Sequence, residues 1–499
     1  MNGGSPFRSL LKGSAVVFAG NIAIYLIGFA YHIFTVRALG ADKYGVWGLA
    51  YTIALLPAQL SYAGLLYGVM KYLTRPGMTE ADRASVLKAS FYLYLGASAI
   101  AALLLCLFNA AAVGSLYAFP GLKPVIYIMA LAAPFVSLIS LIEAVFRSHG
   151  NALTIYKVKI VPELFKLAVI PAALLLSGGS LPLMAALTLI SCVIPVLHGG
   201  AELGRLVAPL RAVWRAEKAG GYARAILLFS LPFMLNEYVY IFKEQVDMLV
   251  AGHFLSGSLI GLYRVSKTLA SVLLFLPTAL TYLLLPMLSR LHAEGKKEEF
   301  QAISERTLKY MIYAGVPMAA LFLVFPEELL SVLYGPQFGP GARSLQLLCL
   351  SSWLVALYAV ASNILLVHAR TRQILIVHMA GIAVNIAANL ALIPVYAATG
   401  AALAYFAGSA LTAALVLALS VPVTGRLVFP ARALWLLVYF AAVTAGCLFS
   451  RGRGAGLNAA IYASVLAATA GSAWLFEREE LAKGLAWLKA RTGRQGAAA

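Results

Sequence analysis

Apolar residues occur along this chain in long runs that short polar segments separate. A helix needs about 20 predominantly apolar residues to cross the hydrocarbon core of a bilayer. Runs of that length recur from end to end and predict about fourteen transmembrane helices. The expected spans are residues 14–36, 46–70, 86–112, 122–146, 155–177, 181–203, 224–251, 259–288, 307–325, 343–368, 374–396, 399–421, 432–450 and 457–476. The pattern predicts an all-α polytopic membrane protein with no soluble domain.

Composition supports lipid as the solvent of most of the chain. Of 499 residues, 62% are hydrophobic and 11% are charged, whereas soluble domains are about 45–50% apolar and about 25% charged. The four cysteines are far apart and show no CxxC spacing, so we expect neither a metal site nor a disulfide. The pattern also contains no catalytic triad or phosphate-binding loop, and we expect a protein that is not an enzyme and has no cofactor beyond a coupling H⁺ or Na⁺.

Basic residues mark one side of the membrane. The formal net charge is +19, and most of the 38 lysines and arginines fall in the segments that share a side with the N-terminus. This bias predicts cytoplasmic N- and C-termini in the cytoplasmic (inner) membrane. No nucleic-acid-binding motif accompanies the charge, so membrane lipid, and not nucleic acid, is the expected partner of these loops.

The two halves of the sequence resemble each other. Four residues of the first half match four residues that lie 216 positions later: Leu39, Gly45, Thr52 and Ala54 match Leu255, Gly261, Thr268 and Ala270. A second stretch, residues 64–75, matches residues 279–290 at an offset of 215. Because each repeat holds six spans, both copies enter the membrane from the same side, and we expect two parallel-related lobes around a central cavity.

The repeat gives a domain plan. We expect an N-lobe at 1–205, a cytoplasmic linker at 206–223, a C-lobe at 224–424, and two further spans with a cytoplasmic tail at 425–499. A two-lobed body of this kind is suited to transport by alternating access.

Charged residues within the predicted spans are the first candidates for a functional site, because each costs roughly 2.5–3.5 kcal/mol at the centre of a bilayer. The densest group lies on the seventh and eighth spans and consists of Lys243, Glu244, Asp247, Arg264 and Lys267. One interpretation is an ion-pair network that joins two helices. The other is a site for a diphosphate, at Arg264 and Lys267, with Asp247, Glu244 and Lys243 as ion-coupling candidates.

Several stretches resemble the polysaccharide-transporter (oligosaccharide flippase) family of the multidrug/oligosaccharidyl-lipid/polysaccharide (MOP) exporter superfamily. They are GFAYHIFTVRALGADKYGVWGLAYTI at 28–53, DMLVAGHFLSGSLIGLYRVSKTL at 247–269, LYGPQFGPGARSLQLL at 333–348 and NLALIPVYAATGAALAYFAGSAL at 389–411. The resemblance implies a flippase that moves a polyprenyl-diphosphate-linked oligosaccharide to the outer leaflet. It also implies glycan polymerases or glycosyltransferases as partners.

The resemblance also assigns roles to single residues. Lys267 falls where lipid II flippases carry a cavity arginine, whereas Tyr31 and His32 stand where those flippases have an Arg-Asp pair, which argues against lipid II as the cargo. His32 and Lys166 are further candidates for the cavity; aromatic packing of His32 and a snorkelling ion pair of Lys166 with Glu163 are the alternatives. Arg37 is expected to act in topology or gating, and Asn21 to bind sugar hydroxyls or to join helices.

Two other transport functions remain open. An ion-coupled multidrug antiporter shares the duplicated six-helix unit, but typically has acidic residues in its cavity. A lipid II flippase shares the fourteen spans.

Overall fold

The computed structural model describes the backbone of residues 6–206, 210–425, 428, 430, 434–449 and 454–496. Every regular element among these residues is a helix. Parts of three predicted segments lie outside them: residues 1–5 of the N-lobe, residues 207–209 of the linker, and residues 426–427, 429, 431–433, 450–453 and 497–499 of the C-terminal segment. The chain divides into two compact units, which are described separately below.

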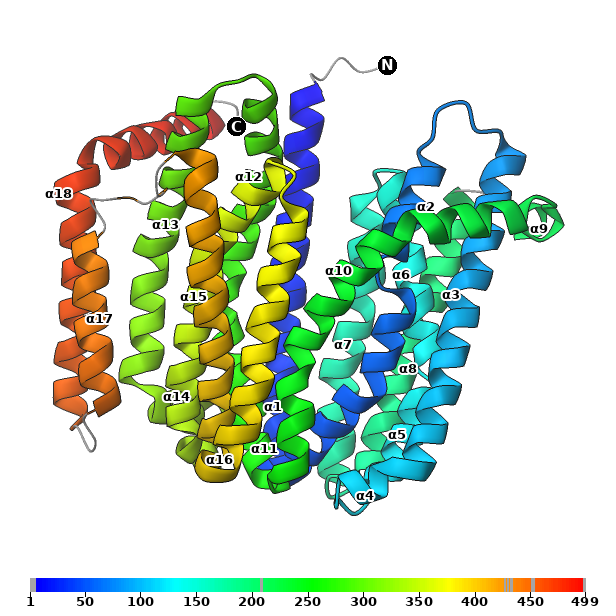
Figure 1. Ribbon diagram of the computed structural model, residues 1–499, viewed down its shortest axis with the longest axis horizontal. Coiled ribbons are helices and arrows are strands. Elements are labelled where there is room, and N and C mark those ends of the chain that lie inside the picture. The colour runs from blue at the N-terminus through cyan, green and yellow to red at the C-terminus, as the bar shows by residue number, and fades with distance from the viewer. Residues whose placement is uncertain are drawn as a thin grey trace. The chain divides into compact units, whose positions relative to one another are not determined.

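The first unit comprises residues 1–264, 333–338 and 389–401. Its elements are α1 (Pro6–Tyr62), α2 (Leu65–Leu73), α3 (Glu80–Phe108), the π-helix η1 (Asn109–Val113), α4 (Gly114–Leu116), α5 (Leu122–Ala130), α6 (Ala133–Ser148), α7 (Ala152–Leu176), α8 (Leu181–Leu206), α9 (Leu210–Arg215), α10 (Ala219–Phe254) and the start of α11 (Gly257–Ser271), as Figure 1 shows. α1 packs along α7, and α7 in turn along α8. A core that includes Val69, Tyr94 and Ile226 joins α2, α3, α6 and α10.

The second unit comprises residues 265–332, 339–388 and 402–499. Its elements are the rest of α11, the 3₁₀ helix η2 (Val272–Leu274), α12 (Phe275–Ala293), α13 (Lys297–Val324), α14 (Pro326–Tyr334), η3 (Pro336–Gly341), α15 (Ala342–Val367), α16 (Thr371–Thr424), α17 (Leu434–Phe449) and α18 (Ala455–Gly496). Residues 333–338 of α14 and η3 and residues 389–401 of α16 belong to the first unit. α13 packs against α12, α15, α17 and α18. Tyr358, Leu365 and Val416 lie in a core between α15 and α16.

Two of the helices are too long to cross a bilayer once. α1 has 57 residues and α16 has 54, which is about 80 Å of helix against a hydrocarbon core of about 30 Å. Each is interrupted by one residue with positive φ, Gly40 (72°) in α1 and Ala397 (51°) in α16. Both breaks fall between two predicted spans, which agrees with the prediction that each helix provides two crossing segments.

The break in α16 corrects one detail of the sequence prediction. The Thr399-Gly400 pair predicts a turn at this point between the spans at 374–396 and 399–421, but the left-handed residue is Ala397. Gly400 has another role, because a Cβ atom there would lie 2.2 Å from the carbonyl oxygen of Leu392. Gly400 therefore permits a close approach of two backbone segments and does not make the turn itself.

Eight helical stretches among the described residues are long and apolar enough to span a membrane. They are Gly20–Leu73, Glu80–Leu116, Leu122–Ser148, Leu181–Arg205, Ala219–Phe254, Lys297–Val324, Pro336–Val367 and Thr371–Thr424. This confirms the predicted all-α polytopic membrane protein. The number of crossings, about fourteen by the spacing of apolar runs, stays a prediction, as do the limits of the predicted lobes.

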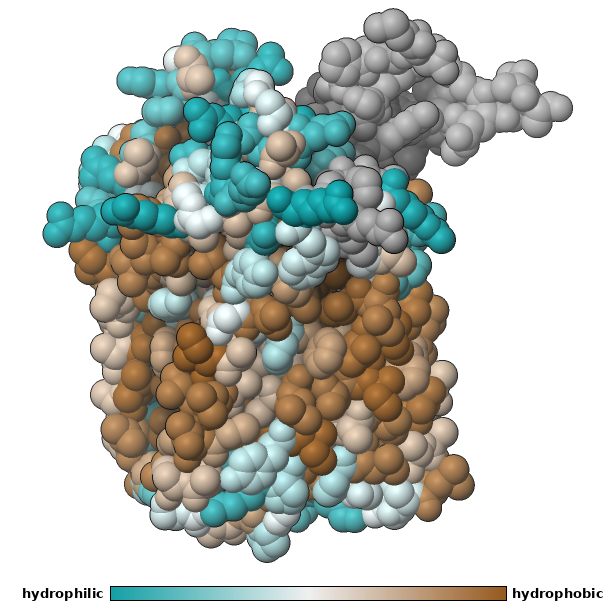
Figure 2. Space-filling model, turned by 90° about the vertical axis from the view of Figure 1, so that its right-hand side faces the viewer, coloured by the Kyte–Doolittle hydropathy of each residue, from teal (hydrophilic) through white to brown (hydrophobic). Residues whose placement is uncertain are grey.

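The surface of the first unit is apolar where a soluble protein would be polar. On α3, Leu103, Leu104 and Leu107 are 60%, 59% and 58% exposed. Figure 2 shows a wide apolar band between hydrophilic ends on the face that includes α3. A contiguous apolar surface of this width is stable only against lipid.

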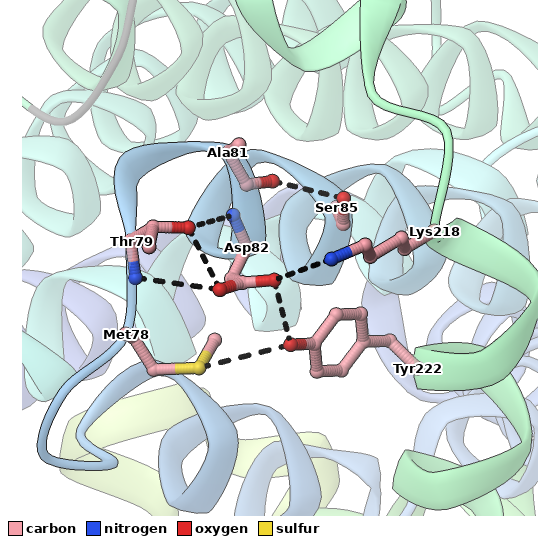
Figure 3. A network of polar contacts seen from close by, with 7 residues as sticks. All are labelled: Met78, Thr79, Ala81, Asp82, Ser85, Lys218 and Tyr222. Carbon is pink, nitrogen blue, oxygen red and sulfur yellow. Dashed lines mark hydrogen bonds and ion pairs between the residues drawn. The ribbon is translucent and has the colours of Figure 1, made fainter.

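A polar network fixes the end of the linker to the start of α3 (Figure 3). Thr79 and Asp82 form a capping box at the helix N-terminus, which satisfies two backbone donors that the helix leaves open. The hydroxyl of Tyr222 in α10 donates a hydrogen bond of 3.1 Å to Asp82, and the Lys218 ammonium lies 3.9 Å from the same carboxylate. The first turn of α10 is thereby tied to α3.

Close packing of glycines within α16 gives a first testable prediction. A Cβ atom at Gly408 would lie 2.7 Å from the carbonyl oxygen of Gly381, and nothing lies within 4 Å of a Cβ atom at Gly96 in α3. Gly408→Ala should therefore destabilise the protein by about 1–3 kcal/mol, since backbone must move to admit the methyl group. Thermal unfolding in detergent measures the effect.

Gly96→Ala is the matched control and should leave the unfolding midpoint unchanged or slightly raised, because alanine is the better helix former. An equal midpoint for the two variants would contradict the close approach at Gly408.

Candidate functional site

His32 lies in the first segment of α1 and faces the second segment across the break at Gly40. Its Nε2 atom and the hydroxyl of Tyr44 share a hydrogen bond of 2.6 Å. Its ring meets the rings of Tyr44 and Tyr334 edge-on, at centroid distances of 5.4 and 5.3 Å. Its Nδ1 atom is buried and has no hydrogen-bond partner in the described part of the chain. Aromatic packing therefore accounts for one side of His32, while Nδ1 keeps its capacity for a further hydrogen bond.

Arg264 lies close to the second segment of α1. Its Nη1 donates a hydrogen bond of 2.8 Å to the carbonyl of Gly48, and its Nε donates one of 3.4 Å to the hydroxyl of Tyr44. The guanidinium carbon is 5.8 and 5.6 Å from the ring centroids of Tyr44 and Tyr51. Contacts of this kind stabilise a partly desolvated cation by about 0.5–2 kcal/mol. Among the described residues, no carboxylate lies within ion-pair distance of Arg264, and the side chain is half-buried.

Glycine at position 48 makes room for that arginine. A Cβ atom at Gly48 would lie 2.3 Å from Cδ of Arg264. The two positions are 216 apart, which is the offset of the predicted repeat, so each occupies the place of the other in its own copy. Arg264 thus donates a hydrogen bond to the backbone of Gly48, the residue at the equivalent position of the first predicted repeat.

Lys166 lies on α7, which packs against α1. Its ammonium lies 2.5 Å from the carboxylate of Glu163 and 5.5 Å from the ring centroid of Tyr31. The side chains of Lys166 and Glu163 are 22% and 20% exposed. The lysine therefore keeps a local counter-ion, and both interpretations of Lys166, an ion pair and a residue of the site, stay open.

We define the α1 polar network as Tyr31, His32, Tyr44, Lys166 and Arg264. Lys166 contacts Tyr31, the neighbouring His32 contacts Tyr44, and Tyr44 contacts Arg264. The network combines two cations with phenol and imidazole groups, which suits it to binding an anion and neighbouring hydroxyl groups.

Asp247 on α10 is fully buried and accepts a hydrogen bond from the hydroxyl of Tyr263 on α11. Tyr263 is also fully buried. Sequence reasoning did not find this tyrosine, although the tight turn between α10 and α11 brings it back to Asp247. The two other ion-coupling candidates, Lys243 and Glu244, are half-buried on α10.

The remaining predicted site residues lie in other surroundings. Lys267 belongs to the second unit, where its ammonium is 4.6 Å from the ring centroid of Tyr405. Asn21 is exposed and accepts a hydrogen bond of 3.1 Å from the hydroxyl of Tyr156. Arg37 is exposed and its Nε donates a hydrogen bond of 2.9 Å to the carbonyl of Leu333.

The architecture resembles that of solved membrane transporters. A solved structure of the lipid II flippase MurJ in an inward closed conformation has a TM-score of 0.68 at 13% identity, covering 93% of this chain and 99% of that one. An inward-facing multidrug resistance MATE transporter of the MOP superfamily has the same TM-score at 13% identity, covering 81% of this chain and 98% of that one. The fold is therefore that of the MOP superfamily.

The family is narrower than the fold. The model of the polysaccharide biosynthesis protein family matches residues 34–343, and the chain belongs to this family. This confirms the membership predicted from the sequence.

Curated relatives match over shorter stretches. The probable flippase AglR of Haloferax volcanii is 29% identical over 165 residues, which is 32% of this chain and 34% of AglR. The uncharacterized membrane protein MJ1068 of Methanocaldococcus jannaschii is 24% identical over 196 residues, 36% of this chain and 38% of the relative. The chain thus spans little more than a third of the length of these relatives.

The buried contact between Tyr263 and Asp247 gives the second prediction. Tyr263→Phe removes a hydroxyl donor from a buried carboxyl group, which should cost about 1–3 kcal/mol of stability. The measurement is the thermal unfolding midpoint in detergent.

Tyr439→Phe is the matched control, because the Tyr439 hydroxyl forms an exposed 2.6 Å hydrogen bond with Ser464, and its loss leaves no buried carboxyl group without a donor. If the two variants lowered the midpoint equally, the contact with Asp247 would carry no special weight.

Proposed function

We propose that this chain is a flippase that translocates a polyprenyl-diphosphate-linked oligosaccharide across the cytoplasmic membrane by alternating access. The observation that carries the proposal is Arg264, a half-buried guanidinium whose contacts in the described structure are a carbonyl, hydroxyls and aromatic rings and include no carboxylate. A cation held in this way keeps its full positive charge for an anionic cargo.

Electrostatics makes such cations necessary for this cargo. A diphosphate that leaves water without compensation loses hydration worth many kcal/mol, because isolated ions are very costly in an apolar medium. Hydrogen bonds from arginine and lysine offset that cost, and arginine adds a planar fork that matches phosphate oxygens. Within the first unit, Lys166 would supply a further point charge, and the hydroxyls of Tyr31 and Tyr44 would suit sugar hydroxyls. Lys267, in the second unit, is a further candidate from the resemblance alone.

Family membership supports a glycan as the cargo. The matching family is named for polysaccharide biosynthesis, and one curated relative is named a probable flippase. The chemistry of the proposed cargo requires a glycosyltransferase to assemble it on the inner leaflet, and a polymerase or transferase to use it outside. The excess of basic residues in alternate loops supports cytoplasmic N- and C-termini.

The two alternatives share the fold and differ in charge. A lipid II flippase is opposed by Tyr31 and His32, which stand where that family carries an arginine and an aspartate. His32 is held by the rings of Tyr44 and Tyr334. A multidrug antiporter for organic cations is opposed by Arg264, which has no carboxylate within ion-pair distance in the described part of the chain, whereas the charge of Lys166 is balanced by Glu163.

The third prediction tests the cargo. Arg264→Gln should reduce translocation of a tagged polyprenyl-diphosphate oligosaccharide at least about tenfold, because a hydrogen bond to a charged group contributes about 1.5–3 kcal/mol. Lys267→Gln should reduce it by a smaller factor, since lysine binds phosphate as a point charge. The measurement is protection of the sugar from a membrane-impermeant glycosidase in reconstituted vesicles.

Lys123→Gln is the control, because Lys123 is exposed beside Gly114 at the start of α5 and should translocate normally. Full activity of Arg264→Gln on the diphosphate cargo, or transport of an organic cation in its place, would contradict the proposal.

The fourth prediction concerns ion coupling. If Asp247 carries the coupling proton or sodium ion, Asp247→Asn should make translocation insensitive to collapse of the gradient by an ionophore. The wild-type protein should lose its activity under the same treatment. Unchanged gradient dependence in Asp247→Asn would remove Asp247 from the coupling pathway.

A further inference from the structure

Two hydrogen bonds in the first unit are related by the internal repeat. Nε of Arg37 donates to the carbonyl of Leu333 at 2.9 Å, and Nδ1 of His253 bonds to the carbonyl of Leu116 at 3.0 Å. Arg37 and His253 are 216 positions apart, and Leu116 and Leu333 are 217 apart. Each bond therefore joins one repeat to the other. If the two repeats are superposed on each other, the donor and acceptor of the first bond fall on the donor and acceptor of the second.

The acceptors are chemically equivalent as well. Leu116 is the last residue of α4, where the continuous stretch from α3 ends, and Leu333 is the penultimate residue of α14. Carbonyl groups in the last turn of a helix have no partner within it and carry the negative end of the helix dipole. A cationic or N–H donor is the matching partner for such a carbonyl. Because the partner of His253 is a carbonyl, Nδ1 must carry the proton.

The residue that follows each acceptor in the sequence also contacts the opposite repeat. Tyr117 follows Leu116, and its hydroxyl donates a hydrogen bond of 3.4 Å to the carbonyl of Leu249 in the other repeat. Tyr334 follows Leu333, and its ring packs edge-on against His32 at 5.3 Å. Both tyrosines thus contact the opposite repeat about one helical turn before the residue that makes the first pair of hydrogen bonds, Arg37 or His253.

Glycines bring the two repeats together between these contacts. A Cβ atom at Gly45 would lie 1.8 Å from the carbonyl oxygen of Gly257, and one at Gly261 would lie 2.1 Å from that of Ala41. Ala41 and Gly257 are again 216 apart, as are Gly45 and Gly261. When one repeat is superposed on the other, these two backbone contacts therefore also fall on each other.

We propose that Arg37 and His253, each bound to the helix-end carbonyl of the opposite repeat, form a two-fold latch that closes the transport pathway at the end of the molecule where α1 breaks at Gly40. This inference goes beyond the proposed function and does not depend on the cargo. The sequence suggested a gating role for Arg37 alone. The structure adds His253 as the residue with the equivalent role in the second repeat.

The bonds of Arg37 and His253 are of a kind that can break and re-form during transport. Arg37 and His253 are exposed, so water competes for both bonds and each contributes little net free energy. At the glycine contact, backbones approach each other without interlocking large side chains. The ring of Tyr334, which is 1% exposed and packs against His32, must also separate when the latch opens.

The test measures access to a residue beyond the latch. Thr52 is 4% exposed and lies one turn past Gly48 on α1. In full-length protein with Cys106, Cys192, Cys349 and Cys447 replaced by serine, a Thr52→Cys probe is labelled with a membrane-impermeant maleimide from each face of reconstituted vesicles. The labelling rate from the face opposite the basic loops should rise about fivefold in Arg37→Ala and in His253→Ala, and further in the double variant.

Conservative and control variants separate the latch from general loosening. Arg37→Lys and His253→Asn keep an N–H donor and should retain slow labelling. Lys43→Ala removes a bond of the same type, from Nζ to the carbonyl of Gly178 at 2.6 Å, but both ends of that bond lie in the first repeat, so labelling should not change.

The proposal is overturned if the double variant labels at the parent rate, or if Lys43→Ala accelerates labelling equally. Should the double variant fail to accumulate in membranes, the two single variants decide by the same criterion. Loss of cargo transport with unchanged labelling would count against the latch and leave the cargo proposal intact.

Discussion

The inability of lipid to form hydrogen bonds governs this structure. Every backbone group within the bilayer must find its partner in the protein, which leaves helices as the form of an open-ended chain. Every polar side chain is under the same constraint. The few charged groups in the apolar segments therefore lie against other protein groups, as with Lys166 and Glu163 or Asp247 and Tyr263.

The constraint also explains the use of glycine. Helices in lipid gain little from burying large apolar side chains against each other, because lipid solvates those side chains equally well. Close backbone approach is the alternative source of contact energy. It occurs at Gly45 and Gly261 in the first unit and at Gly381 and Gly408 in the second.

The sequence predicted the fold class well because the period and length of apolar runs follow from the bilayer itself. The family was equally predictable from short stretches such as residues 28–53. The charged residues of the candidate site are conspicuous in the sequence because they interrupt apolar runs, and their role in transport stays a prediction. The turn in α16 was displaced by two residues, because Gly400 suggests a turn by its identity and serves a close approach instead.

Partners were harder to predict than the charges themselves. Nothing in the sequence distinguishes Tyr263, which binds Asp247, from 24 other tyrosines. Arg264 contacts the backbone carbonyl of Gly48 and occupies the space that a side chain at position 48 would fill. Neither a backbone acceptor nor a space can be recognised from the pattern of residues along the chain. The relation between Arg37 and His253 was hidden because different residue types occupy equivalent places in the two repeats.

The pairing of Arg264 with Gly48 bears on how such a protein could arise. In a symmetric dimer of identical six-helix chains, both positions would hold the same residue. Two arginines would repel each other and compete for one space, and two glycines would leave the place without charge. A fused, duplicated chain is released from that identity, so one copy supplies the cation and the other supplies the space. A fused chain can therefore hold an arginine at position 264 and a glycine at position 48. An assembly of separate, identical subunits cannot combine the two.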